Sequence, residues 1–234
     1  MKKLLFGVIL NTIAFSLWAQ DDIDFTPPKT INIDDESDLT NQWETTLGWG
    51  FIIAQPNAPG AEIKPVSSHQ FHFGLKYFFD ISKIYLPGFE LNYEYNTYKL
   101  VQDSNKIFPN TNLHQRQQLN INTINLQFNN RLVFKRKEQK PYLFMDISGY
   151  AGWNFATSVY TVDTHTSVNY YGGSKTEVYY RNLIYIEDLQ YGIKTALFIK
   201  NFGIYGQYRL NNLIKKSFYY PDMPQWLVGI MIKS

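Results

Sequence analysis

Ser67 and His69 are the two residues whose types and spacing come nearest to a hydrolytic site. Residues two apart on a strand point to the same face, so the imidazole could activate the serine hydroxyl as a nucleophile. Such a pair also needs a carboxylate that orients the imidazole. The expected neighbours on the next strand are Thr97 and Lys99, and Glu62 belongs to a predicted loop, so no orienting carboxylate is found. We therefore predict no catalytic residue and no enzyme activity, and keep a lipid-modifying hydrolase as an alternative.

Glu90 and Glu94 form a second candidate, a pair of carboxylates on one face of a predicted strand. Four residues of strand separate them by about 13 Å, which is wider than the carboxylate pairs of glycosidases. Lys76 and His72 are expected to face them from the neighbouring strand. The sequence thus favours a structural role for both carboxylates, as members of ion pairs.

Metal and phosphate sites find no support in the sequence. His114 and His165 occur singly in predicted loops, and Tyr170-Tyr171-Gly172-Gly173 lacks the lysine and the helix of a phosphate loop. We predict no metal site and no cofactor. Aromatic residues of the predicted loops have two interpretations, ordinary packing or contact with a partner or a surface polysaccharide: Phe108, Tyr160, Tyr170, Tyr179, Phe218 and Tyr219.

Composition restricts the class of protein. The chain has 234 residues, which suits one large all-β domain, and 17% of them are aromatic, which favours strands. The net charge of +2 is too balanced to indicate a nucleic-acid partner. No cysteine is present, so disulfides, thiolate metal sites and an N-terminal lipoprotein anchor are excluded.

The N-terminal residues predict export. Residues 1–19 combine Lys2 and Lys3 with an apolar stretch and end at a cleavage site before Gln20, as in a secretory signal peptide. The alternative, a membrane anchor helix, needs about 20 apolar residues, and this stretch is shorter. Residues 20–42 are acidic and contain Pro27-Pro28, which predicts a flexible periplasmic tail. Charged or amide residues interrupt every later apolar segment, so a membrane protein built from residues 43–234 has to be a closed barrel.

Alternation with period two is clearest between residues 69 and 97. In its first half, Phe71, Phe73, Leu75, Tyr77 and Phe79 alternate with Gln70, His72, Gly74, Lys76 and Asp80. Such a pattern is typical of a strand with two unlike environments. The same pattern recurs along the chain and predicts eight strands, at residues 43–53, 69–80, 89–97, 120–134, 142–155, 189–199, 204–210 and 226–232.

The connections between these strands are alternately long and short, and residues 156–182 form the longest predicted loop. Outer-membrane barrels have an even number of antiparallel strands, short periplasmic turns and long outer loops. The fold predicted for residues 43–234 is therefore an eight-stranded antiparallel up-and-down transmembrane β-barrel, with both termini in the periplasm. A change of phase within the fourth strand predicts a β-bulge near Thr123.

The charged faces contain residues that can neutralise one another inside such a barrel. Aligning the apolar faces places Lys76 opposite Glu90, His72 opposite Glu94 and Arg131 opposite Asp146. Lys194 and Arg209 are expected to face each other and to need carboxylates such as Glu44 across the lumen. The four expected cations, Lys76, Arg131, Lys194 and Arg209, balance the four carboxylates, Glu44, Glu90, Glu94 and Asp146. An eight-stranded interior is filled by side chains, and charges persist there only when they are paired.

The opposite orientation is the main structural alternative. A secreted lipocalin-like carrier would place the aromatic face inside, around a ligand, and the charged face in water. Trp43, Trp49, Trp153 and Trp226 lie on the apolar faces, mostly near strand ends, as in the interfacial girdles of membrane barrels. We therefore predict that the apolar face is on the outside.

The chain resembles the small outer-membrane β-barrel proteins of Bacteroidota, the OmpA-like and PorT-like barrel group. The resemblance rests on the Lys2-Lys3 signal ending at Ala19-Gln20, on the dyad strands and on the closing residues 226–232. It implies a Gram-negative outer-membrane location and a non-enzymatic role, as a structural barrel or an accessory subunit of a secretion or assembly complex. The expected partners are outer-membrane lipid and a larger envelope complex, and no nucleic acid.

Overall fold

The computed structural model describes residues 42–53, 59–137, 140–164 and 174–234, all of them within one compact unit, Leu39–Ser234. In the described part of this unit, two 3₁₀ turns lie in the loops, Pro65–Ser67 and Lys216–Phe218. The rest of its regular structure is strand: β1 (Gln42–Ile52), β2 (His69–Phe78), β3 (Tyr85–Lys99), β4 (Arg116–Lys137), β5 (Lys140–Thr164), β6 (Lys175–Arg181), β7 (Leu189–Ile199), β8 (Phe202–Arg209) and β9 (Trp226–Lys233).

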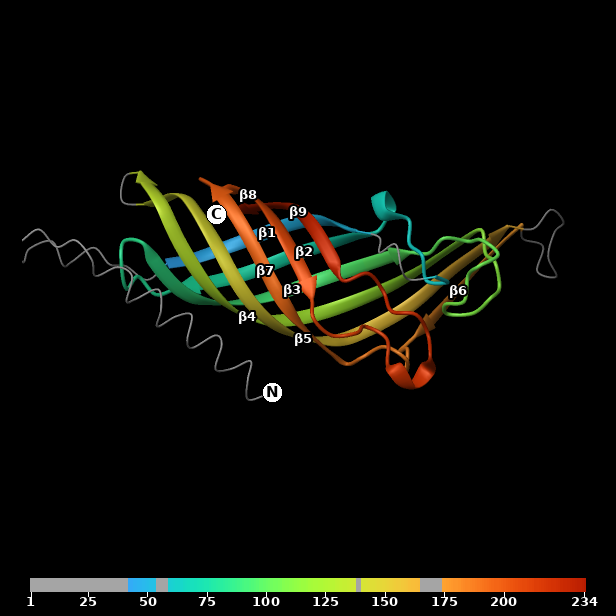
Figure 1. The fold of residues 1–234 in the computed structure, drawn as a ribbon. Coiled ribbons are helices and arrows are strands. Elements are labelled where there is room, and N and C mark those ends of the chain that lie inside the picture. Colours follow the sequence, from blue (N-terminus) through green and yellow to red (C-terminus); the bar gives the residue numbers. More distant parts are fainter. Residues whose placement is uncertain (1–41, 54–58, 138–139, 165–173) are drawn as a thin grey trace, which may run out of the picture. The chain divides into compact units, whose positions relative to one another are not determined.

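One antiparallel sheet contains all of these strands and closes on itself. Eight strands form a ring in the order β1, β2, β3, β4, β5, β7, β8, β9, and each pairs with the next one in this order. The pairing of β9 with β1 closes the ring. The ninth strand, β6, pairs with β5 outside this ring (Figure 1). The predicted all-β, eight-stranded antiparallel ring is confirmed.

The structure corrects the prediction of a loop at residues 156–182. β5 continues to Thr164, and its residues 158–164 pair with β6 to form a sheet that extends beyond the ring. Polar residues occupy both faces of this extension, as in the sequence Lys-Thr-Glu-Val-Tyr-Tyr-Arg of β6. A strand without one buried apolar face lacks the alternating signal from which it could be predicted.

The registers predicted for two pairs of strands, β2–β3 and β4–β5, are confirmed. Lys76 lies opposite Glu90 and His72 opposite Glu94 between β2 and β3, and Arg131 lies opposite Asp146 between β4 and β5. The predicted bulge is present as a register shift between Asn122 and Thr123.

The predicted pairing of Lys194 with Arg209 is wrong by two residues. Lys194 lies opposite Gln207, and Arg209 lies opposite Gly192. Lys194 opposite Arg209 requires a turn at residues 201–202, whereas the β7–β8 turn lies at residues 200–201, with Lys200 at a φ of 58°. Moving a hairpin turn by one residue slides the register by two, and a slip of two leaves every side chain on its own face.

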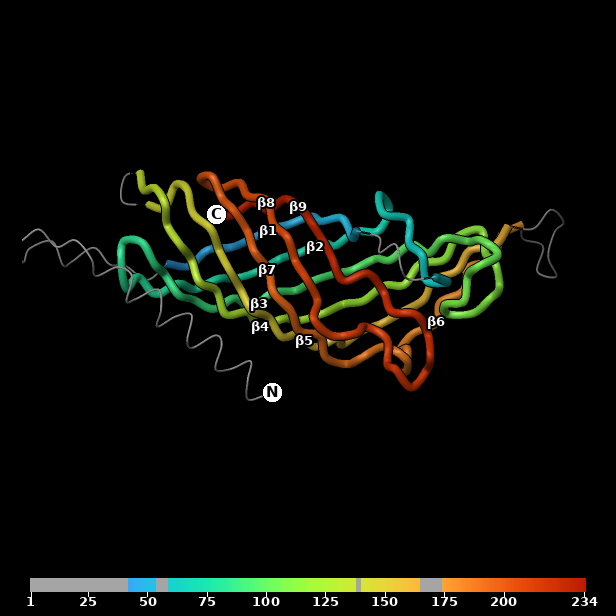
Figure 2. Tube along the Cα trace, in the orientation of Figure 1, coloured from blue at the N-terminus to red at the C-terminus, as the bar shows by residue number. Residues whose placement is uncertain are grey.

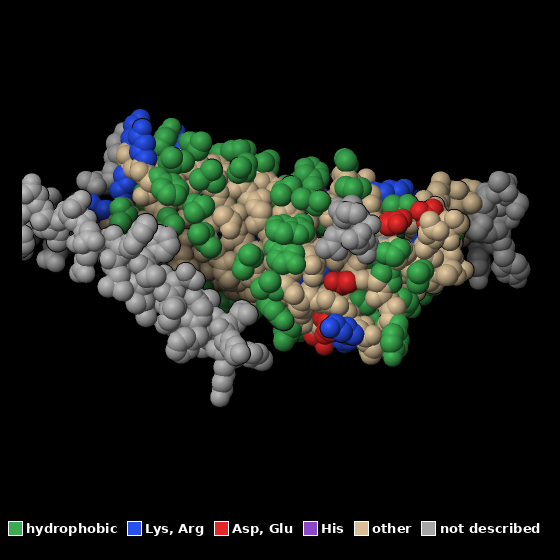
Figure 3. Space-filling view, viewed as in Figure 1, with side chains coloured by type: hydrophobic (Ala, Val, Ile, Leu, Met, Phe, Trp, Pro, Cys, Tyr) green, Lys and Arg blue, Asp and Glu red, His purple; other side chains and the backbone are tan. Residues whose placement is uncertain are grey.

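The side chains have the predicted orientation. Phe73, Leu126 and Ile193 on the outer face are 50%, 60% and 50% exposed, whereas Lys76 and Arg131 are at most 2% exposed. Hydrophobic side chains cover the visible face of the strands, and charged side chains gather toward its two ends (Figure 3). The lipocalin-like arrangement, with the aromatic face inside, is therefore not that of this barrel.

The two ends of the barrel differ. Ser234 donates its backbone N–H to Thr45, so the chain's C-terminus lies beside the start of β1, at what we call the terminal end. The opposite end, the loop end, contains the long connections and β6 (Figure 2). A layer of fully buried apolar side chains closes the barrel near its terminal end: Phe78, Leu86, Phe144, Phe198 and Met231. Apolar side chains of the loops are also buried at the loop end, including Ile63, Leu100, Phe108, Ile186, Leu213 and Met223.

Candidate functional site

The barrel interior is organised around Arg131. Its Nη1 and Nη2 donate to the two carboxylate oxygens of Glu44, at 2.7 Å each. Its Nε and Nη2 donate to Asp146, at 2.7 and 3.0 Å. The guanidinium carbon lies 3.9 Å from the ring centre of Phe78 and 4.1 Å from that of Phe144. Four of the five guanidinium N–H groups thus donate to carboxylates, and aromatic rings cover both faces of this fully buried arginine.

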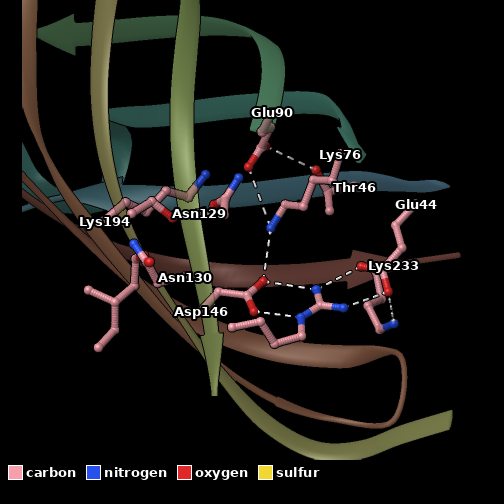
Figure 4. Close-up of polar contacts among 12 residues, drawn as sticks. Glu44, Thr46, Lys76, Glu90, Asn129, Asn130, Asp146, Lys194 and Lys233 are labelled. Carbon is pink, nitrogen blue, oxygen red and sulfur yellow. Dashed lines mark hydrogen bonds and ion pairs between the residues drawn. The ribbon is translucent and has the colours of Figure 1, made fainter. Parts of the chain in front are cut away.

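Lys76 connects this cluster to a second one. Its Nζ lies 3.2 Å from Asp146 Oδ2 and 3.5 Å from Glu90 Oε2. His72 then bridges the two glutamates, with Nε2 3.0 Å from Glu90 Oε1 and Nδ1 3.6 Å from Glu94 Oε1. Figure 4 shows Lys76 reaching from Glu90 to Asp146, with Glu44 and Lys233 close by. Glu90 and Glu94 are therefore members of a buried ion network, as predicted.

One cation of this network was missed from the sequence. Lys233, on the inner face of β9, donates to Glu44 at 2.6 Å. Arg209, which was expected in the network, pairs instead with Asp222 and with the carbonyl of Met223 near the loop end. The predicted balance of four cations and four carboxylates is retained, with Lys233 in the place of Arg209. Alternation along β9 places Lys233 on the face opposite Ile232. This pattern could have identified Lys233 as an inner cation from the sequence.

The interior has little free space. Between Gln70, Tyr150 and Gln207, in the half toward the loop end, the cavity measures about 20 Å³. A wider vestibule of about 790 Å³ opens at the terminal end, lined among others by Trp43 and Lys140, and the buried Phe78–Phe144–Phe198 layer lies beyond it. The interior cavity between Gln70, Tyr150 and Gln207 is thus too small for a small-molecule ligand.

The candidate pair Ser67 and His69 is not arranged for nucleophilic chemistry. His69 Nδ1 lies 3.0 Å from the backbone carbonyl of Ser67, not from its hydroxyl. The imidazole stacks on Trp49, with ring centres 4.7 Å apart and an angle of 12°. Thr97 is its cross-strand neighbour, as predicted. The contacts of His69 are thus those of a packed surface ring.

The remaining sequence candidates are the two loop histidines, His114 and His165, and residues 170–173. His114 Nδ1 lies 2.8 Å from Asp163 Oδ2, a contact that the sequence did not predict. In the part of the chain that the structure describes, no three His, Asp or Glu side chains come together as metal ligands. His165 and residues 170–173 lie outside the described residues.

The aromatic loop residues separate into packed and exposed ones. Phe108 is fully buried and meets Tyr185 and Tyr220 edge-on, at 5.5 and 5.4 Å. Burial in this cluster raises the pKa of the Tyr185 hydroxyl above its ordinary value. Tyr219, by contrast, is 93% exposed. Tyr160 and Tyr179 stack on each other across the β5–β6 pair at 4.5 Å.

Comparisons with known proteins give no family for this chain: no protein-family model matches it, and no curated protein is significantly similar to it. None of the described residues forms a helix long and apolar enough to cross a membrane.

Proposed function

We propose that this chain is an integral outer-membrane β-barrel with a plugged polar interior, which serves as a non-enzymatic structural or accessory subunit of an envelope complex. In this proposal, residues 1–19 are a cleaved signal peptide, residues 20–42 a periplasmic tail and residues 43–234 the membrane barrel. The proposal also includes membership of the small outer-membrane barrels of Bacteroidota that the sequence resembles.

The observation that carries the proposal is the continuous apolar outer face of the ring. Large apolar side chains that are at least two-fifths exposed occur on every strand of the ring, among them Leu47, Phe73, Leu91, Leu126, Ile147, Ile193, Ile204 and Ile230. Water-soluble monomers rarely expose contiguous apolar patches larger than a few hundred Å². A bilayer instead favours such a face, and the closed ring leaves no unpaired strand edge toward lipid.

The interior supports a structural role over transport. A pore needs a water-filled lumen, and here the space between the strands is occupied by Arg131, Lys76 and their carboxylates, all nearly fully buried. A carrier needs a ligand chamber, and the internal cavity of about 20 Å³ has room for a water molecule but not for a small-molecule ligand. The geometry of Ser67 and His69 gives no support to hydrolysis.

The accessory role is tested by the size of the native particle. Membranes of the native cells would be solubilised in a mild detergent, and the protein followed through native electrophoresis with an antibody. We expect it to migrate as part of a larger assembly and to co-purify with another envelope protein. Recovery of the free monomer at every detergent concentration would contradict the accessory role and leave a solitary structural barrel.

A further inference from the structure

A pocket of about 390 Å³ lies at the loop end, outside the barrel interior, against the outer part of β5 and β6. Its size is that of small-molecule sites in proteins. The residues that line it combine amides, aromatic rings, a histidine and an arginine, among them Asn110, His114, Gln117, Arg181 and Tyr185. Nothing in the proposed structural role uses this pocket.

Gln117 provides the strongest sign of a ligand. The side chain is 1% exposed, and its Oε1 accepts a hydrogen bond from Gln102. Its Nε2 has no hydrogen-bond partner among the described residues. A buried donor without a partner costs about 1–3 kcal/mol, and an acceptor on a bound molecule would remove that cost.

Other polar groups of the pocket are held in place but keep free donors. Asn110 Oδ1 accepts from the backbone N–H of Asn112 at 3.2 Å and from Lys106 Nζ at 3.5 Å, which fixes the amide and leaves its NH₂ group without a described acceptor. His114 is held by Asp163 at 2.8 Å. Several fixed amide and ring donors around one small space are suited to a ligand with many hydroxyl oxygens.

The charge of the pocket favours an acidic ligand. Arg181 is exposed and has no ion pair among the described contacts, and none of the described residues that line the pocket is a carboxylate. Asp163 lies behind His114 and compensates for one positive charge at most. Arginine is also the residue best suited to bind a carboxylate with two parallel hydrogen bonds.

The aromatic rings of the pocket add flat apolar faces. Tyr185 is held edge-on by Phe108 and Tyr220, at 5.5 and 5.8 Å, so its ring is fixed before any ligand arrives. A preformed aromatic surface beside fixed amides can cover the apolar face of a sugar ring while its hydroxyls are hydrogen-bonded. We propose that this pocket binds the end of an acidic saccharide, with Gln117 and Arg181 as its specific contacts.

The test is a calorimetric titration of the full-length protein in a detergent without a sugar headgroup. The probes are tetragalacturonate, which is acidic, and maltotetraose, which is neutral. Gln117→Met removes the unpaired donor and Arg181→Gln removes the cation. Gln118→Met and Arg116→Gln are the matched controls, since both residues belong to β4 and neither lines the pocket.

We expect tetragalacturonate to bind and maltotetraose to bind at least about tenfold more weakly, because one charge-assisted hydrogen bond contributes about that much. Gln117→Met and Arg181→Gln should each weaken the binding of tetragalacturonate by about tenfold. Gln117→Met should not lower the thermal midpoint of the free protein. It removes an unpaired buried donor, and the amide of Gln102, which loses Gln117 Oε1 as an acceptor, keeps the carbonyl of Leu100. Absence of binding, equal binding of the two probes, or pocket variants that bind like the controls would overturn the proposal.

Discussion

Arg131 combines features that make a buried charge tolerable. Two carboxylates accept from four of its five N–H groups and two phenyl rings cover its faces, so the desolvated cation is surrounded by partners. The carboxylates also have further cations, since Glu44 is bound by Lys233 and Asp146 by Lys76. Removal of one member leaves the others charged and buried, which is the costly case for an ion network.

Arg131→Met should therefore lower the free energy of unfolding by about 3–5 kcal/mol, because Glu44 and Asp146 lose their main partner. Arg131→Lys should recover part of this loss, since an ammonium cannot bond both carboxylates as the guanidinium does. Urea unfolding of the protein in lipid vesicles measures both effects. The control is Arg116→Met, which replaces an exposed arginine of the same strand. Equal stabilities of the Arg131→Met and Arg116→Met variants would contradict the role given to the network.

Sequence reasoning reached these residues through alternation alone. Period two separates inner from outer side chains, so Lys76, Glu90 and Asp146 were correctly placed inside. It does not say which inner residue lies opposite which, because a slip of two residues preserves the faces. The contact between Arg131 and Glu44 joins β4 to β1 across the lumen, and no local pattern encodes such a distance.

At the scale of the element, β2 shows why the barrel interior needs a glycine at position 74. Gly74 lies between Thr46 and Asn92, and an added Cβ would contact Glu90 Oε1 and come within 2.8 Å of Thr46 Oγ1. The Glu90 carboxylate cannot move away from such a Cβ without losing its contact with His72 or with Lys76. The small residue is thus a condition for the ion network between β2 and β3.

Gly74→Ala should destabilise the barrel by about 1–3 kcal/mol, the usual cost of overpacking an interior. Gly149→Ala is the matched control, since a Cβ there meets no atom within 4 Å on the outer face. Thermal unfolding in the same lipid checks the pair. If the two alanine variants had the same thermal midpoint, Gly74 would not be constrained by its neighbours.

The outer face of β4 provides a test of what surrounds the ring. Leu126 is 60% exposed in the middle of the strand, so in a bilayer its side chain meets acyl chains. Leu126→Arg should then cost about 2–4 kcal/mol of stability in lipid vesicles. Val66→Arg, in a loop-end turn where Val66 is 85% exposed, should have almost no effect. Equal stability of the two variants would argue against lipid at the outer face.

At the scale of the whole molecule, the distribution of side chains is inverted relative to a water-soluble protein. Ion pairs occupy the centre, and leucine, isoleucine and phenylalanine cover the ring. The sequence predicted this inversion and the closed ring of eight strands, because each depends on repeated local alternation. It did not predict β6 or the loop-end pocket, because both are built from mixed polar segments that acquire their structure only from contacts between distant parts of the chain.

The central claim is that lipid covers the outer face of the ring, and fractionation of native cells tests it most directly. Cells would be broken without detergent, the inner and outer membranes separated by density, and the outer-membrane fraction washed with alkaline carbonate. We predict that the protein stays in the washed outer-membrane fraction and is released by detergent alone. Recovery in the soluble fraction, or release by the carbonate wash, would contradict the account.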